Sequence, residues 1–439
     1  MSKHSSNSEK VDVEVEVSVQ SAQAESTEET EGGYGWVIVF CSFVVNFLAL
    51  GIESTWGIYQ DYYLSSEILG PSNNLRLAWV GAIQAVGVSI FGLPAGKLSE
   101  MIGHRWTGII GSLALGLSLI TASFSKDVWH LYLNQGALFA IGSAFMVIPA
   151  LTIPSQWFVK RRGLTTGIGV SGYGVGGLVL SPVTRKLIDE VGVRWALRIM
   201  GILTVVLCVI AFAFMKPRDV KRQASSSTTS LTLSQILKDG KFYAVYAFMF
   251  LHIFGYYIPT FYNPEYARVR LHRDGTDSAT TLAIQAGLSA IGRVLAGWLS
   301  DYVGPILALT VCQVLSGIAQ MVYWPFCDSF ASVSGFAAVY GFFSGGIVSL
   351  SPVFLAEIYG AERLPSIFGL ALSGTIPGTL AGPSIAGAII DANTSPDGSI
   401  NFVPVQLYGG SWLIAGALVT FGIGAKRYYN RAKSSASAE

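Results

Sequence analysis

GKLSEMIG at residues 96–103 recurs as GWLSDYVG at residues 297–304, 201 residues later, and both segments follow the pattern G-x-L-S-acid-x-x-G. The same offset relates three further pairs of identical or similar residues: Phe158 with Tyr359, Arg162 with Arg363, and Pro182 with Pro383. One short match could arise by chance, but one offset that holds at four places indicates a duplicated chain. The sequence therefore predicts two structurally equivalent halves.

The composition is that of a membrane protein. Hydrophobic residues make up 51% of the 439-residue chain and charged residues only 13%, with a mean hydropathy of +0.51. Soluble domains carry roughly 25% charged residues, so that class is excluded. The 28 basic residues nearly balance the 27 acidic ones. No general electrostatic field therefore favours nucleic acid, and the expected macroscopic partner is a lipid bilayer.

A spanning helix needs about 20 mostly apolar residues to cross the hydrocarbon core. Twelve segments meet this requirement, near residues 36–57, 78–98, 106–124, 129–152, 164–187, 196–215, 242–262, 279–300, 306–325, 332–355, 366–390 and 407–425. The expected organisation is a disordered acidic tail over 1–32, six-helix halves over 33–215 and 242–425, a polar linker over 216–241, and a tail over 426–439. The fold class is an all-α polytopic membrane protein.

Flanking cations predict the orientation of these spans. With the N-terminus inside, 18 of the 28 Lys and Arg residues fall in cytoplasmic segments and nine in external ones. Because cytoplasmic loops carry the excess of Lys and Arg, both termini are expected to be cytoplasmic. The cell membrane is the expected location, with an organelle membrane as the alternative.

Motifs for cofactor chemistry are missing from the sequence. The four cysteines are scattered without the short spacings of zinc or redox sites. GIGVSG at 167–172 matches a dinucleotide fingerprint, but it lies inside an apolar helical segment instead of after a strand. No phosphate-binding loop or H-E-x-x-H zinc motif occurs. We therefore expect no cofactor, no metal and no enzymatic activity.

The sequence resembles the major facilitator superfamily over residues 33–425, because it has two six-helix halves, a basic linker and acidic turns. Within it, EGGYGW at 31–36 and WFVKRRGLTTGIGVSGYGVGG at 157–177 are similar to the two signatures of the monocarboxylate transporter family. The resemblance implies a secondary transporter that works by alternating access, with one solute site between the halves.

That family's best-known transport residues are a Lys near the end of helix 1 and an Asp placed four residues before an Arg on helix 8. The equivalent positions in this sequence are Ser54, Ser289 and Arg293, so only the Arg is retained. This departure resembles the fungal branch of the family, whose members carry varied organic solutes.

Arg293 is the strongest candidate site residue, because a charge at mid-bilayer costs about 2.5–3.5 kcal/mol on insertion scales. Its planar fork of donors suits a carboxylate, although a structural arginine that bridges helices is the alternative. The other candidate substrate-binding or coupling residues are Glu53, Asn46, Asn134, His252, Tyr256 and Gln285. Glu53 could carry a proton or simply be hydrated. A direct Glu53–Arg293 bond is not expected, since it would need a broken or strongly tilted helix.

The duplicated acidic turns suggest conformational gating at the cytoplasmic side, through neighbouring cations and helix-terminal amides. The candidate gating residues are Glu100, Arg105, Lys160, Arg161, Arg162 and Asp301. Asn393-Thr394-Ser395 matches a glycosylation site in an external loop, and the following Pro396 leaves its occupancy open.

The sequence thus predicts a transporter for a small organic anion or an amphipathic metabolite, with or without proton coupling, that functions as a monomer. The alternative is a nontransporting nutrient sensor on the same fold. Such a sensor is expected to carry a long signalling extension, and the 32-residue head and 14-residue tail argue against it.

Overall fold

The computed structural model describes residues 32–66, 68, 74–216, 239–272, 275–361, 364–395 and 400–436. The expected disordered tail, apart from Gly32, lies outside the described residues. So do most of the linker and Arg363, one member of the offset pairs.

Twelve helices in the described part of the chain are long and apolar enough to cross a membrane, which confirms the predicted number of spans. The first six spans are built from α2 (Tyr34–Ser54), α3 (Trp56–Ser66), α4 (Asn74–Ile102), α5 (His104–Ala122), α6 (Val128–Leu131), η1 (Tyr132–Leu138), α7 (Phe139–Thr152), α8 (Pro154–Trp157), α9 (Arg162–Val191) and α10 (Val193–Phe214). The last six are built from α12 (Gly240–Tyr256), α13 (Ile258–Val269), α14 (Gly275–Val303), α15 (Pro305–Ile318), η2 (Ala319–Tyr323), η3 (Trp324–Phe326), α16 (Phe330–Tyr359), α17 (Leu364–Leu372), η4 (Ser373–Thr375), α18 (Ile376–Ala392) and α19 (Val403–Ala436).

Many helices run further than their apolar stretches. The first span continues to Ser66, and α19 continues to Ala436, past the apolar segment expected to end near residue 425. Hydropathy marks only the part of a helix that suits lipid, whereas backbone hydrogen bonding continues into polar residues beyond it. The ends of the spans are therefore the least accurate part of the prediction.

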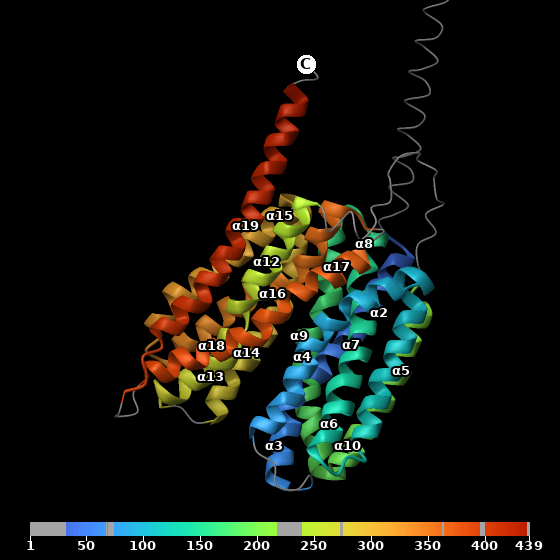
Figure 1. Cartoon of the computed structure of the whole chain (residues 1–439), viewed down its shortest axis with the longest axis vertical. Helices are drawn as coiled ribbons and strands as arrows, with labels where there is room; N and C mark the ends of the chain where they lie inside the picture. The colour runs from blue at the N-terminus through green and yellow to red at the C-terminus, as the bar shows by residue number, and fades with distance from the viewer. Residues whose placement is uncertain are drawn as a thin grey trace, which may run out of the picture.

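The two halves pack together at one end of the molecule and separate toward the other (Figure 1). We call the first end the closed face. It carries residues 96–103 and 297–304, and α2 begins and α19 ends there. The opposite end, with α3 and α13, is the open face. At the closed face α9 packs against α14 and α4 packs against α17, so each contact joins one half to the other.

Glycine permits this close packing. A Cβ atom added to Gly163 would clash with the carbonyl oxygen of Gly297, and one added to Gly167 would clash with the carbonyl oxygen of Arg293. The backbones of α9 and α14 consequently touch, as is typical of helices that pack through small residues in membranes.

The first and seventh spans are broken at equivalent positions of the two halves. One break lies at Thr55, between α2 and α3, and the other at Tyr257, between α12 and α13. The second break frees two carbonyl groups. The Nε2 of Gln320 donates to the oxygen of Gly255 at 3.1 Å, and the hydroxyl of Tyr340 donates to the oxygen of Tyr256 at 2.6 Å. Neighbouring helices thus satisfy the backbone groups that the break exposes.

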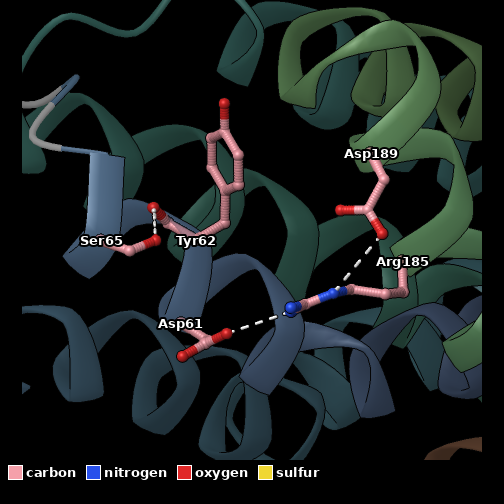
Figure 2. Close-up of polar contacts among 5 residues, drawn as sticks. All are labelled: Asp61, Tyr62, Ser65, Arg185 and Asp189. Atoms are coloured by element: carbon pink, nitrogen blue, oxygen red, sulfur yellow. Dashed lines mark hydrogen bonds and ion pairs between the residues drawn. The ribbon is translucent and has the colours of Figure 1, made fainter.

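An ion-pair chain joins the outer part of the first broken span to α9 (Figure 2). Arg185 lies 3.1 Å from Asp61 of α3 and 3.8 Å from Asp189 of its own helix. More than half of each of these side chains is exposed. Solvent-exposed pairs of this kind contribute at most about 1 kcal/mol. These two ion pairs therefore orient α3 at the open face more than they stabilise the fold.

Candidate solute-binding cavity

A cavity of about 440 Å³ lies between the two halves, where the breaks in the first and seventh spans meet. The first half contributes Ser54 and one face of α9, and the second contributes residues of α12, α13, α14 and α16. Most of the wall is apolar or aromatic, with Tyr173, Leu178, Pro182, Tyr256, Tyr257 and Leu282. Arg293 is the single charged residue in this lining.

Arg293 lies on α14, and its side chain is almost completely buried, with 1% of the residue exposed. Its guanidinium lies 4.6 Å from the ring centre of Tyr173, and its Nη1 donates to the carbonyl oxygen of Val170 at 3.4 Å. It also interacts with the hydroxyl of Tyr256. Its Nε has no hydrogen-bond partner, and no carboxylate lies within 4.0 Å of it in the described ranges. The site thus presents a buried cation with free donor capacity.

The three positions that the resemblance singled out lie in this one cavity. Ser54, Ser289 and Arg293 all belong to its wall, although they come from two different halves. Where the family places a Lys and an Asp, this cavity holds two hydroxyl groups. Arg293 is consequently left without the acidic neighbour that an Asp four residues earlier on the same helix face would supply.

Two further candidates from the sequence also line the cavity, namely Tyr256 and Gln285. The Nε2 of Gln285 donates to the hydroxyl of Thr260 at 2.8 Å, and its Oε1 is buried without a partner in the described chain. Gln285 therefore retains one acceptor that a bound solute could use.

Glu53 lies beside the cavity, next to the lining residue Ser54. Its Oε2 is buried and accepts no hydrogen bond within the described residues. No Glu53–Arg293 ion pair occurs among those residues. Tyr173 and Tyr257 each lie within electrostatic range of both Glu53 and Arg293.

Asn46, Asn134 and His252 lie away from the cavity wall. The Nδ2 of Asn46 donates to the oxygen of Ser42 at 2.9 Å and to that of Gly169 at 3.2 Å, which ties α2 to α9. His252 donates from Nδ1 to the carbonyl of Phe248 at 2.9 Å, within its own helix. Asn134 is half-buried in η1, a segment that contacts α4 and α5.

Sequence reasoning missed Tyr173, whose ring centre lies 4.6 Å from the guanidinium of Arg293. Tyr173 lies within the second signature, in the run SGYGVGG, where the glycines drew attention to packing. A single large aromatic residue among helix-packing glycines was the available signal, because packing alone favours small residues there.

At the closed face, each acid of the duplicated turns caps a helix of the opposite half. Asp301 accepts hydrogen bonds from the backbone N–H groups of Gly163 at 2.6 Å and Leu164 at 2.9 Å, in the first turn of α9. Glu100 accepts one from the backbone N–H of Ser366 at 3.2 Å, in the first turn of α17. Carboxylates suit these positions, because the first N–H groups of a helix lack intrahelical partners and carry partial positive charge.

The cationic candidates surround this contact in different ways. The Nε of Arg162 donates to the carbonyl of Phe158 at 3.4 Å, while Lys160 and Arg161 are exposed just before α9 begins. Arg105 is half-buried and lies 5.8 Å from the ring centre of the adjacent Trp106.

The glycosylation candidate Asn393 follows the end of α18. It is half-buried, and its Nδ2 donates to the carbonyl of Ile389 at 2.8 Å. The neighbouring Thr394 forms an isolated bridge with Ile400, and Pro396 lies outside the described residues. The same nitrogen is the attachment point of a glycan, and it carries two hydrogens, of which the bond to Ile389 uses one.

The sequence matches the model of the Major Facilitator Superfamily over residues 35–326 and 249–435. The chain belongs to this superfamily. It is 30% identical over 406 residues to the MFS-type transporter hasB of Aspergillus fumigatus, with 89% of this chain and 88% of that protein covered. It is 28% identical to the aspyridones efflux protein apdF of Emericella nidulans, over 89% of this chain and 78% of that protein.

Monocarboxylate transporter 10 of Homo sapiens is 29% identical over 437 residues, which cover 94% of this chain and 82% of that protein. Among solved structures, the Major Facilitator Superfamily transporter FucP in the outward conformation has a TM-score of 0.65 at 14% sequence identity. That match covers 88% of this chain and 97% of FucP, and at this identity it supports the fold. The Major Facilitator Superfamily fold and the resemblance to monocarboxylate transporters are thereby confirmed.

As a Major Facilitator Superfamily member with twelve spans, the protein is a multi-pass membrane protein related to transporters. Both the cavity and the closed-face contacts lie between its two halves. In this fold, movement of one half relative to the other exposes a solute site at their interface first to one side of the membrane and then to the other.

Proposed function

We propose that the protein is a secondary transporter of a small organic anion or amphipathic metabolite, with Arg293 as the anchor for a carboxylate. The observation that carries this proposal is the buried guanidinium in an otherwise uncharged cavity wall. A buried cation is costly unless something pairs with it, so an anionic solute supplies the missing charge. The planar donors of arginine suit the two oxygens of a carboxylate.

The walls of the cavity indicate which anions fit best. Tyr173, Tyr256 and Tyr257 surround the guanidinium, and leucine and proline side chains continue the wall. An amphipathic monoanion places its charge on Arg293 and its apolar body against these rings. A zwitterionic amino acid would also need an acceptor for its ammonium group, and the lining contains no carboxylate.

We propose that the closed face is the cytoplasmic one, so that the cavity faces outward in this conformation. The positive-inside distribution of Lys and Arg supports this orientation. Single cysteines at Met101 of the closed face and Ser65 of the open face test it, because both residues are exposed. On a background without the four native cysteines, impermeant thiol reagents should label the Ser65 position in intact cells and spare the Met101 position. The opposite labelling would reverse the topology.

Glu53 is proposed as the group that links transport to protons. With Arg293 charged, a bound carboxylate neutralises the cation and leaves Glu53 as the unbalanced charge. Protonation of Glu53 would make the loaded site neutral, which lowers the electrostatic cost of closing water out of the cavity. One chain supplies the whole cavity, so the functional unit is proposed to be a monomer.

The experiment is uptake of a panel of organic anions into vesicles that contain the purified protein, with the Arg293→Lys and Arg293→Ala variants alongside. A charge-assisted contact contributes roughly 1.5–3 kcal/mol, so Arg293→Ala should weaken affinity about ten- to hundredfold. Arg293→Lys should weaken it less but measurably, because an ammonium cannot reproduce the planar fork. Normal kinetics in an intact Arg293→Ala variant would refute the anchoring role.

A further inference from the structure

Arg293 belongs to the second half, yet two of its contacts lie on the first half. Tyr173 and Val170 are both on α9, at 4.6 Å from the guanidinium to the ring centre and 3.4 Å from Nη1 to the carbonyl oxygen. Tyr256, which the guanidinium also touches, comes from the same half as Arg293. The guanidinium therefore bridges the two halves through α9.

This bridge lies where the cavity ends and the packed interface begins. Gly167, six residues before Tyr173 on α9, abuts the carbonyl oxygen of Arg293, so the backbones are already in contact there. On the other side, Tyr173 and Arg293 both line the cavity. The contact between Tyr173 and Arg293 therefore belongs both to the solute site and to the interface between α9 and α14 that holds the halves together at the closed face.

The strength of that contact depends on the charge that a solute would change. A cation over an aromatic ring is attracted by the ring's quadrupole, and the attraction is strongest when water is excluded. A carboxylate bound to the guanidinium neutralises the cation and draws N–H donors away from the carbonyl of Val170. Binding of an anion should therefore weaken the attachment of Arg293 to α9.

We infer that Tyr173 is a positioning residue that couples occupancy to movement: it holds Arg293 against the first half while the cavity is empty and releases it when an anion binds. The inference rests on the proposed role of Arg293 as the anion anchor. It predicts that the empty protein opens its closed face rarely and the loaded protein opens it readily. Exchange of solute across the membrane should consequently be faster than net flux.

The test compares Tyr173→Leu with Tyr173→Phe, and uses Tyr256→Leu as the matched control. Phenylalanine keeps the ring over the guanidinium, whereas leucine removes it. Tyr256→Leu removes an equally large aromatic neighbour of the same guanidinium, but from the second half. Spin labels at Met101 and Tyr302, which are 80% and 73% exposed at the closed-face ends of α4 and α14, report the separation of the halves.

Without any solute, Tyr173→Leu should raise the open-to-closed ratio at the closed face about 2- to 30-fold, the range expected for one cation–π contact. Tyr173→Phe should resemble the parent protein, and Tyr256→Leu should change the ratio less than Tyr173→Leu does, because the contact between Tyr256 and Arg293 lies within the second half. A Tyr173→Leu protein with parental distances would overturn the inference, as would an equal shift in Tyr256→Leu.

The release step uses 3-phenyllactate as the anionic probe, with binding measured by calorimetry. In protein that binds it, the probe should open the closed face of the parent and add little to the opening of Tyr173→Leu. Binding without a change in distance would overturn the release step. Binding that survives Arg293→Ala would instead refute the proposed anchor, while the measurement without solute still decides whether Tyr173 holds the halves together.

Discussion

The carboxylate of Asp301, in the second half, accepts a hydrogen bond from the backbone N–H of Gly163, in the first half, at 2.6 Å. Its second oxygen accepts another from Leu164 at 2.9 Å, whereas the equivalent Glu100 accepts one bond from Ser366 at 3.2 Å. The duplicated turns therefore make the same kind of contact with unequal geometry. Charge-assisted bonds strengthen as they shorten, so the Asp301 contact should hold the closed face more tightly.

Asp301→Asn should disturb the closed face more than Glu100→Gln. The amide keeps one acceptor oxygen but loses the charge that favours a helix N-terminus. Hydrogen bonds to a charged group contribute roughly 1.5–3 kcal/mol. Asp301→Asn should therefore shift the equilibrium, by about tenfold or more, toward the conformation in which the two halves separate at the closed face. Turnover in vesicles should fall while solute affinity changes little.

Asp189→Asn is the matched control, because Asp189 is an exposed acid on the open face. Its ion pair with Arg185 contributes little, so the variant should transport normally. A tenfold loss of affinity with unchanged turnover in Asp301→Asn would place that carboxylate in the solute site and contradict the closing role.

Asn46→Ala should destabilise the protein without affecting solute binding. Asn46 is fully buried and its Nδ2 bonds to the carbonyl of Gly169, between α2 and α9. Its Oδ1 is already unsatisfied in the described chain, so the net loss should be about 1 kcal/mol. Thermal unfolding in detergent measures the first effect and anion titration the second. Weaker binding with unchanged thermal stability would show that Asn46 contacts solute after all.

The position of Asn46 in the structure shows what the sequence could predict and what it could not. Hydropathy and the offset repeat predicted twelve spans in two halves, because lipid imposes length and composition on each helix. A polar residue within a span can also be recognised from the sequence, since its insertion into the membrane costs free energy. Which neighbour it faces depends on the rotation of the helix, and so Asn46 bonds to α9 and His252 bonds within its own helix, while Gln285 reaches the cavity.

Contacts across the two halves were the hardest to foresee. Glu100 and Asp301 were recognised from their repeat, but the partners Ser366 and Gly163 offer only backbone N–H groups. Backbone donors carry no residue-type signal, so no side-chain pattern could identify them. The contact between Tyr173 and Arg293 depends in the same way on how α9 meets α14.

Glu53→Gln should abolish the dependence of uptake on a proton gradient. Glutamine preserves the size of the side chain but cannot gain or lose a proton, so an imposed pH difference should no longer drive accumulation. Exchange of labelled for unlabelled solute should survive, because it requires no net proton movement. Vesicle uptake with and without the gradient measures both quantities.

Asp61→Asn provides the comparison for Glu53→Gln, since Asp61 lies on the same broken span but is exposed and paired with Arg185 (Figure 2). Proton-driven uptake should persist in that variant. Gradient-dependent accumulation that persists equally in Glu53→Gln would remove Glu53 from the coupling step.

Ser289→Asp should weaken anion binding by supplying Arg293 with an internal partner. Position 289 lies four residues before Arg293 on α14, and both side chains line the cavity. Residues at this spacing share a helix face, so the new carboxylate can reach the guanidinium and compete with a solute for it. Affinity for 3-phenyllactate should fall about ten- to hundredfold, the range expected for loss of one charge-assisted contact.

Ser289→Asn has nearly the same shape without the charge and should bind close to normally. Adding Ser54→Lys to Ser289→Asp restores a net positive cavity and should recover part of the lost affinity. Equal binding by Ser289→Asp and Ser289→Asn in calorimetric titrations would mean that the solute does not depend on the charge of Arg293.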